Sequence, residues 1–303
     1  RILERRPEVL RKFALGHKWG FTGERTEPVD KAVPKQEVGI LFAELCVRQT
    51  APGGRIGIIL PNGYLGNTSA RYSVLREWLL RNTKIVAIMA FPRFTFKKSG
   101  ADVSASAVIL EKRHKPLERA VDSENYPFYA GILESVGWSV SDKKAIRLFK
   151  REAETGAYLT DSDNNQIPDA DFSRVLADLM SSQVPVAFPW LGQNYPPPPQ
   201  TGGWSVAIKS VLERPDLSID PKRWCERAAN TRSQIAAVPH IRLGDFAAFV
   251  PHGKRSVLPA TLYDYVEIEG ASDGVIRPDR LRGWQLPDRA RHRADNGDIF
   301  VGG

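Results

Sequence analysis

Hydrophobic and polar residues between positions 36 and 112 follow two spacings, one typical of helices and one typical of strands. Apolar residues first recur at i, i+3, i+4, i+7 and i+8, which places them on one face of a helix. These residues are Val38, Leu41, Phe42, Leu45 and Cys46. The spacing therefore predicts an amphipathic helix, and Pro52-Gly53-Gly54 is expected to end it.

A wholly apolar run follows this helix. Residues 56–60, with the sequence IGIIL, predict a short strand covered on both faces, as in a parallel sheet. A second helix is expected to start near Asn67 or Thr68, because either residue is a good N-cap. The apolar stripe of this second helix consists of Tyr72, Leu75, Trp78 and Leu79.

Two further strands complete the pattern. Residues 85–90 form another apolar run, and residues 103–110 alternate between apolar and polar or small side chains. A loop that contains three phenylalanines separates them. The order helix, strand, helix, strand, loop, strand within about 75 residues predicts the closing half of an α/β sheet.

The rest of the chain has weaker patterns. Residues 1–35 are basic and rich in Gly and Pro, which is typical of a surface segment. A proline run at 196–199 followed by Gly202-Gly203 has the composition of a linker. Three short β-like runs come after it, at 246–250, 263–268 and 299–301.

These patterns predict three parts of the chain. Residues 1–185 are expected to form the α/β domain, and residues 186–236 a linker and connecting segment. Residues 237–303 are expected to begin a smaller, mostly β (α+β) domain that the sequence contains only in part.

Composition and charge favour a nucleic-acid partner. The chain has 42% hydrophobic and 26% charged residues, which is typical of a folded globular protein. No run of about 18 apolar residues is present, so no membrane span is expected. Since no signal peptide opens the chain, the cytoplasm is the expected compartment. The net charge of +8 favours a polyanion, although a merely basic globular protein explains the charge equally well.

Several familiar motifs are excluded. The glycines of Gly53-Gly54-Arg55-Ile56-Gly57 precede a strand, whereas a phosphate loop follows one and opens a helix. The segment starting at Asp161 resembles a calcium loop but has Gln166 and Phe172 where that loop needs Gly and Glu. Two cysteines and five scattered histidines give no metal site, and no serine-hydrolase elbow occurs.

Five short motifs follow one another in residues 36–112. They are Leu41-Phe42-Ala43-Glu44, residues 51–65 (APGGRIGIILPNGYL), residues 75–80 (LREWLL), residues 91–96 (FPRFTF) and residues 103–112 (VSASAVILEK). Together they resemble the adenine N-6 DNA methyltransferases of type I and related fused restriction–modification systems. Upstream, Leu15–Trp19 resembles the sequence after the catalytic Asn-Pro-Pro-Phe loop of some members. The resemblance covers about the first 150 residues and implies the C-terminal half of a Rossmann-like methyltransferase sheet.

Four blocks near the C-terminus carry a second resemblance. They are residues 241–245 (IRLGD), 263–268 (YDYVEI), 286–291 (LPDRAR) and 296–299 (NGDI). They resemble the opening of a target-recognition domain of restriction specificity subunits. An unrelated small β domain remains the alternative for this part of the chain.

The first resemblance implies methyl transfer from S-adenosylmethionine to a flipped-out adenine in double-stranded DNA. It also implies a Gly-rich cofactor loop and an Asn-Pro-Pro-Phe/Tyr catalytic loop, and this sequence contains neither motif. We therefore expect no catalytic, cofactor-binding or metal-binding residue in the chain, which we expect to be an inactive internal piece of a longer enzyme. The expected partners are DNA and specificity and restriction subunits or fused domains.

The resemblance also implies an adenine pocket. In the family, an aromatic residue in the loop before the last strand stacks on the base, and Phe96 fits best, with Phe91 and Phe94 as competitors. All three fit ordinary core positions equally well. The residues Arg93, Lys97 and Lys98 are expected either to contact DNA phosphates or to form a solvated loop.

Two further DNA contacts are expected in the recognition-like part, from Arg289 and Arg291, with surface solubility as the alternative. A non-catalytic DNA-binding or subunit-docking module is the rival interpretation of the whole chain. An RNA or protein methyltransferase of the same fold is a third, and the C-terminal blocks argue against it.

Overall fold

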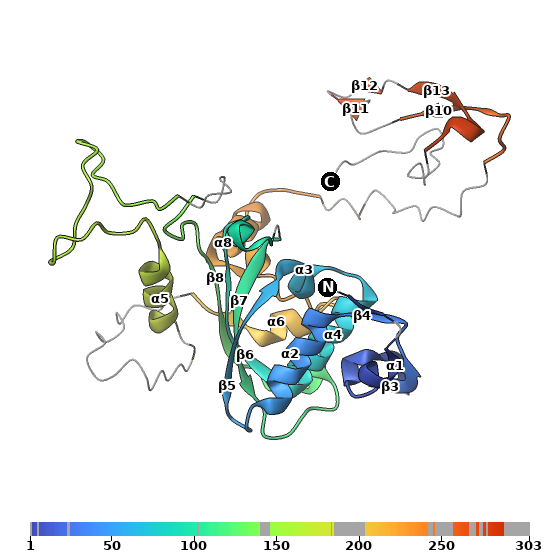
Figure 1. Ribbon diagram of the computed structural model, residues 1–303, viewed down its shortest axis with the longest axis horizontal. Helices are drawn as coiled ribbons and strands as arrows, with labels where there is room; N and C mark the ends of the chain where they lie inside the picture. Colours follow the sequence, from blue (N-terminus) through green and yellow to red (C-terminus); the bar gives the residue numbers. More distant parts are fainter. Residues whose placement is uncertain are drawn as a thin grey trace. The chain divides into compact units, whose positions relative to one another are not determined.

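The computed structural model describes residues 2–4, 6–22, 25–101, 103–139, 146–182, 184, 204–241, 245, 257–266, 271–272, 275–276 and 278–287. The chain divides into two compact units, Arg1–Val238 and Pro239–Gly303 (Figure 1). In the described part of the chain, no helix has both the length and the apolar character needed to cross a membrane.

A five-stranded mixed sheet forms the centre of the larger unit, with the strand order β5-β7-β6-β8-β9. The strands are β5 (Arg55–Pro61), β6 (Thr83–Ala90), β7 (Ala105–Lys112), β8 (Pro127–Ile132) and β9 (Val206–Ala207). β7 is antiparallel to β5 and β6, while β6 and β8 are parallel. The carboxyl ends of β5, β6 and β8 therefore meet at one edge of the sheet, which we call the carboxyl edge. The predicted α/β class is confirmed.

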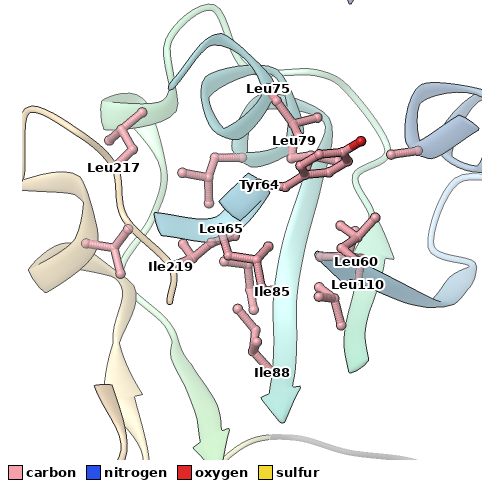
Figure 2. Close-up of a cluster of buried hydrophobic side chains, with 14 of the residues drawn as sticks. Leu60, Tyr64, Leu65, Leu75, Leu79, Ile85, Ile88, Leu110, Leu217 and Ile219 are labelled. Atoms are coloured by element: carbon pink, nitrogen blue, oxygen red, sulfur yellow. The ribbon is translucent and has the colours of Figure 1, made fainter. Parts of the chain in front are cut away.

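One face of the sheet is covered by helices (Figure 1). They are α2 (Val38–Gln49), α3 (Asn62–Gly66), α4 (Ala70–Asn82) and α6 (Ile208–Leu212). Leu65, Leu75 and Ile88 lie at the centre of this main core and are fully buried (Figure 2). Because each such side chain contributes about 1.5–3 kcal/mol on burial, this face holds most of the unit together.

The opposite face is covered only in part by the described residues. Helix α5 (Phe172–Ser181) packs its Leu179 against Val86 and Tyr129, over strands β6 and β8. On β5 the same face is open, and 53% of Ile59 is exposed. The expectation that residues 56–60 would be covered on both faces is therefore wrong for the described structure. β5 is a terminal strand with one antiparallel neighbour, and its apolar composition does not distinguish that position from a central one.

Helix α2 has the predicted position, but only part of the predicted stripe meets the sheet. Leu41 is buried and Cys46 packs against the main core, as predicted. Val38, Phe42 and Leu45, expected on the same stripe, are 43%, 55% and 39% exposed, and Ile40 and Val47 are buried in addition. Both sets of residues recur at helical spacing, so the helix has two apolar faces, and the spacing alone does not show which one meets the sheet.

The segment before α2 contains a hairpin and several short elements. These are β1 (Ile2–Glu4), α1 (Pro7–Leu10), η1 (Ala14–Gly16), β2 (His17–Thr22), β3 (Arg25–Ala32) and β4 (Lys35–Glu37). Leu10 and Leu15 are buried, so this segment is not the purely surface segment that the sequence predicts. The reason is Glu44 of α2, whose buried carboxylate accepts hydrogen bonds from the N–H groups of Ala14 and Leu15, both at 2.8 Å.

Residues 204–225, expected in the connecting segment, add to the larger unit. They contain β9, α6 and α7 (Pro221–Trp224), and helix α8 (Glu226–Ala236) follows. Ile208, Val211 and Ile219 belong to the main core. The buried side chain of Arg76 on α4 donates to the Asp216 carbonyl oxygen at 2.7 and 2.9 Å, which fixes this segment to the helix layer.

Between β8 and α5 the described residues 133–139 and 146–171 form an extended ribbon, which we call the arm. It follows η3 (Ala120–Asp122) and β8 in the chain. Isolated bridges such as Val136 with Ala170 and Phe149 with Pro168 connect its passes. At its base, the Asp171 side chain accepts hydrogen bonds from the N–H groups of Glu134 and Ser135.

The second unit contains two short antiparallel pairs among its described residues. β10 (Leu262–Tyr265) pairs with β13 (Asp279–Arg282), and β11 (Ala271–Ser272) pairs with β12 (Val275–Ile276). The turn η6 (Gly283–Gln285) follows β13. β10 falls within the predicted run 263–268, apart from its first residue. The predicted runs 246–250 and 299–301 lie outside the described residues.

Candidate functional site

The carboxyl edge brings together three chain segments that are far apart in the sequence. Asn62 follows β5, a loop of residues 91–101 follows β6, and Leu133 follows β8. In open α/β sheets, ligands bind at this edge, because strand ends and helix starts leave backbone groups and loop side chains available there. We call residues 91–101 the phenylalanine loop.

Hydrogen bonds join Asn62 to the start of β7 at the carboxyl edge. The Ser106 hydroxyl, fully buried on β7, donates to the Asn62 side-chain oxygen at 2.8 Å. The Asn62 backbone N–H donates to the Ser104 carbonyl oxygen, also at 2.8 Å. These bonds fix the start of α3 against the strand that leaves the phenylalanine loop.

Backbone hydrogen bonds shape the phenylalanine loop itself. The Phe91 N–H donates to Ala105 across the loop at 3.0 Å, and the Ala101 N–H donates to Phe96 at 3.2 Å. The short helix η2 (Lys97–Ser99) lies within this span. The Thr95 hydroxyl donates to the Pro92 carbonyl oxygen at 2.7 Å, and Thr95 is buried.

The three phenylalanines have different environments. The rings of Phe91 and Phe96 meet edge to face with centroids 5.3 Å apart. Phe91 also packs against the cluster under α5, while Phe96 is not part of it. Phe94 has a positive φ of 68°, which is unusual for a residue with a side chain. The structure therefore brings all three to one loop, as predicted, and their role toward a base stays a prediction.

Two of the predicted cations contact Phe94. The Arg93 guanidinium lies 4.6 Å from the ring centroid of Phe94, and the Lys97 ammonium lies 4.7 Å from it. Both cations thus gather at the carboxyl edge. The Lys98 side chain and the residues Arg289 and Arg291 lie outside the part of the chain that the structure describes.

Trp138 of the arm contacts the phenylalanine loop, and no sequence motif predicts this contact. The Trp138 indole N–H donates to the Thr95 carbonyl oxygen at 3.2 Å. The two residues are 43 positions apart in the sequence, and the acceptor is a backbone oxygen, which every residue has. The sequence therefore does not indicate this contact. Sequence reasoning missed this contact.

A second polar cluster, also missed, lies where β4 leads into α2. Glu37 accepts hydrogen bonds from Tyr64 at 2.9 Å, Tyr72 at 2.7 Å and Arg71 at 2.9 Å. Burial by itself would raise the pKa of Glu37, but these three donors together lower it below its ordinary value. The carboxylate is therefore held in its charged form, and the cluster joins α2, α3 and α4.

A cavity of about 360 Å³ lies at the end of β8. Tyr129 lines it, and an added Cβ at Gly131 would lie 2.6 Å from the tyrosine hydroxyl, so only glycine leaves room for this ring. Burial, and then the carboxylate of Asp178, raise the pKa of Tyr129 above its ordinary value. Arg174 lines the same cavity and pairs with Asp178 and Asp171. Charges of both signs, partly paired, do not favour a polyanion here.

Metal chemistry has no support in the described residues, because they contain no group of three or more His, Cys, Asp or Glu side chains that could hold an ion. The carboxyl edge instead offers aromatic rings, two cations and a hydrogen-bonded Asn–Ser pair. These groups suit a planar base and a phosphate better than a metal-dependent reaction.

One family model is similar to part of this chain. Residues 16–125 match the family model described as N-6 DNA Methylase. The matched segment runs from β2 to the residues before β8 and contains α2, the Asn62 turn, the phenylalanine loop and β7. No curated protein sequence matches the chain.

Several solved structures are similar over part of the chain. A structure of the type I R-M system has a TM-score of 0.35 at 14% identity, over 69% of this chain and 37% of that one. The EcoKI M protein of a type I restriction enzyme has a TM-score of 0.29 at 13% identity, over 42% and 26%. A protein assigned as a type I modification subunit from Vibrio vulnificus YJ016 has a TM-score of 0.33 at 16% identity, over 67% and 36%.

The chain thus spans 26 to 37% of the length of these three structures. At these TM-scores the likenesses carry no argument about activity. The N-6 DNA Methylase match therefore carries the functional interpretation.

Proposed function

We propose that this chain supplies the adenine-binding side of an S-adenosylmethionine-dependent DNA adenine N-6 methyltransferase of a restriction–modification system. The observation that carries the proposal is the N-6 DNA Methylase match over residues 16–125, which includes the phenylalanine loop at the carboxyl edge. The enzyme class comes from that match, and the contacts of the loop support the assignment of residues.

Phe96 is the proposed stacking partner of the flipped adenine. A base that leaves the duplex loses its stacking, and an aromatic face restores about 1–3 kcal/mol. The ring of Phe96 is half-buried and makes an edge contact with Phe91, so Phe91 supports the orientation of the Phe96 ring. Phe91 itself packs on the cluster under α5 and is a supporting residue in this proposal.

Arg93 and Lys97 are the proposed phosphate contacts beside that base. Both lie against the ring of Phe94, which holds two cations on one short loop. A flipped nucleotide places its own phosphates next to the base pocket, so positive charge at this point contributes to binding without reading sequence. Lys98, Arg289 and Arg291 are proposed as further DNA contacts from the sequence alone.

The methyl donor is proposed to be S-adenosylmethionine, held by residues outside this chain. Neither the Gly-rich loop nor the Asn-Pro-Pro-Phe/Tyr loop occurs in the sequence, and no residue of the chain is assigned to either task. When bound, the donor would supply the electrophilic methyl group. This chain would hold and orient the adenine and exclude water from it. Residues 237–303 are proposed as the start of a target-recognition domain, and specificity and restriction subunits as partners.

Two measurements test the proposal. The purified chain, incubated with labelled S-adenosylmethionine and duplex DNA, is expected to transfer no methyl group, and appreciable transfer would contradict the assignment of the missing loops. In the complete enzyme, Phe96→Ala is expected to lower methylation and the fluorescence of a 2-aminopurine placed at the target base. A loss of about 1–3 kcal/mol in stacking corresponds to roughly 5- to 150-fold. Phe172→Ala, at an exposed position on α5, is the matched control.

A non-catalytic docking module is the second candidate. The exposed apolar face of α2 and the open face of β5 favour it, because exposed apolar patches mark sites of protein–protein contact. Two results together would support this candidate over the first. The chain would bind DNA in a salt-sensitive way without binding S-adenosylmethionine, and the complete protein would lack transferase activity.

A further inference from the structure

The phenylalanine loop contains a strained residue that needs support. Phe94 has a φ of 68°, in the left-handed region, where a residue with a side chain pays about 1–2 kcal/mol. Its ring contacts two cations, Arg93 and Lys97, which repel each other. The conformation persists only where neighbouring contacts favour it.

Thr95, the residue after Phe94, receives that support from two directions. Its hydroxyl donates to the Pro92 carbonyl oxygen at 2.7 Å, within the loop. Its own carbonyl oxygen accepts the Trp138 indole N–H at 3.2 Å, from outside the loop. The second bond fixes the peptide group between Thr95 and Phe96, one residue after the left-handed Phe94.

Trp138 is itself held at the base of the arm. The preceding residue, Gly137, donates its N–H to the Asp169 carbonyl oxygen at 2.8 Å and accepts the Leu148 N–H at 3.0 Å. Gly137 has a φ of 83°, a conformation that glycine adopts without strain. Three passes of the arm therefore meet at Gly137, and these bonds fix the backbone just before Trp138 within the arm.

We infer that Trp138 is a positioning residue, which orders the phenylalanine loop through Thr95 and couples the arm to it. The structural part of this inference stands on the contacts above. Its consequence for the base pocket rests on the proposed function, because Phe96 lies in the same loop, next to Thr95. A partner or DNA segment that moves the arm would thereby change the geometry of the pocket.

Trp138→Phe removes the indole N–H and keeps an aromatic ring, so it isolates the hydrogen bond. The matched control is Trp204→Phe, since the Trp204 indole also donates to a backbone carbonyl, that of Trp224, at 2.8 Å. Hydrogen exchange of the chain is measured for both variants. In Trp138→Phe, the amides of Lys97, Ser99 and Gly100, which are bonded within the loop, are expected to exchange about fivefold faster, the factor that one neutral hydrogen bond provides.

The strands β6 and β7 provide the internal reference, because their amides are expected to exchange at unchanged rates in both variants. Equal melting temperatures for the two variants with faster loop exchange only in Trp138→Phe support the inference. Loop exchange that is the same in Trp138→Phe, Trp204→Phe and the unaltered chain overturns it.

Activity of the complete enzyme separates this inference from the proposed function. Trp138→Phe is expected to lower kcat and base-flipping fluorescence while leaving the KM for S-adenosylmethionine unchanged. Because partial unfolding would also lower the apparent kcat, the assay is run well below the melting temperatures of both variants, and Trp204→Phe is expected to keep the kcat of the unaltered enzyme. If the loop loosens in Trp138→Phe but Phe96→Ala methylates normally, the positioning inference stands and the proposed base contact fails.

Discussion

Arg76 offers the sharpest test of how the helix layer is held together. Its side chain is fully buried, and the guanidinium donates to the carbonyl oxygens of Tyr64 at 2.9 Å, Asn67 at 2.9 Å and Asp216 at 2.7 Å. No carboxylate is among its acceptors in the described residues; besides the three carbonyl oxygens, the guanidinium donates to the Ser73 hydroxyl at 3.2 Å. Replacing it with Met keeps much of the volume and leaves these three carbonyl groups without a donor.

The magnitude follows from two opposing effects. Hydrogen bonds from a charged donor contribute about 1.5–3 kcal/mol each. Burial lowers the pKa of Arg76 to about 10, which corresponds to a cost of about 3 kcal/mol for keeping the charge inside. The bonds outweigh this cost. We expect Arg76→Met to lower the free energy of unfolding by about 3–5 kcal/mol, because each buried carbonyl left without a donor costs about 1–3 kcal/mol, and removal of the buried charge offsets part of the sum.

Urea unfolding followed by circular dichroism measures this difference. Arg227→Met is the matched control, because Arg227 is 80% exposed and should change stability by at most about 0.5 kcal/mol. The amide of Ile219, which donates to the Leu65 carbonyl oxygen at 2.9 Å, should also exchange faster in Arg76→Met, since Asp216 holds this segment in place. Equal unfolding midpoints for the two variants would refute the reasoning.

Two further predictions concern charge. Burial by itself would raise the pKa of Glu124, but hydrogen bonds with Lys84 and Arg113 lower it to about 2. The charged Glu124 therefore stabilises the folded state above pH 4.5, and this stabilisation is lost as the pH falls toward 2. Glu124→Gln should therefore flatten the acid branch of a stability curve, and an unchanged branch would contradict this. Lys97→Gln in the complete enzyme should reduce the salt dependence of DNA binding by about one unit in log–log slope, and an equal slope would remove Lys97 from the phosphate contacts.

The spacing of apolar residues predicted where the elements lie, but not which faces they bury. Helix α2 and strands β5, β6 and β7 fall close to the predicted positions. The buried face of α2 was mispredicted in part, because Val38, Phe42 and Leu45 recur as regularly as the residues that meet the sheet. Which face of a strand is covered depends on the order of the strands in the sheet. The seven residues of β5 do not by themselves show that it is a terminal strand.

The candidate site was predictable only where it is local in sequence. The phenylalanines and the cations beside them occupy one stretch of the chain, so a single loop gathers them. Trp138 and Glu37 act through bonds to groups that are distant in sequence or belong to the backbone. Periodicity does not detect such contacts, and the N-terminal segment was misjudged for the same reason, since its burial depends on the carboxylate of Glu44.

The terminal position of β5 links folding to assembly. In the described residues nothing pairs with its outer edge, and Ile59 together with Phe42 on α2 leaves apolar surface exposed. An extended edge of this kind pairs with any strand that reaches it first, whether the intended one or that of a neighbouring molecule. The exposed edge of β5 is therefore a point at which the protein can self-associate, and a strand that pairs with it would suppress that association.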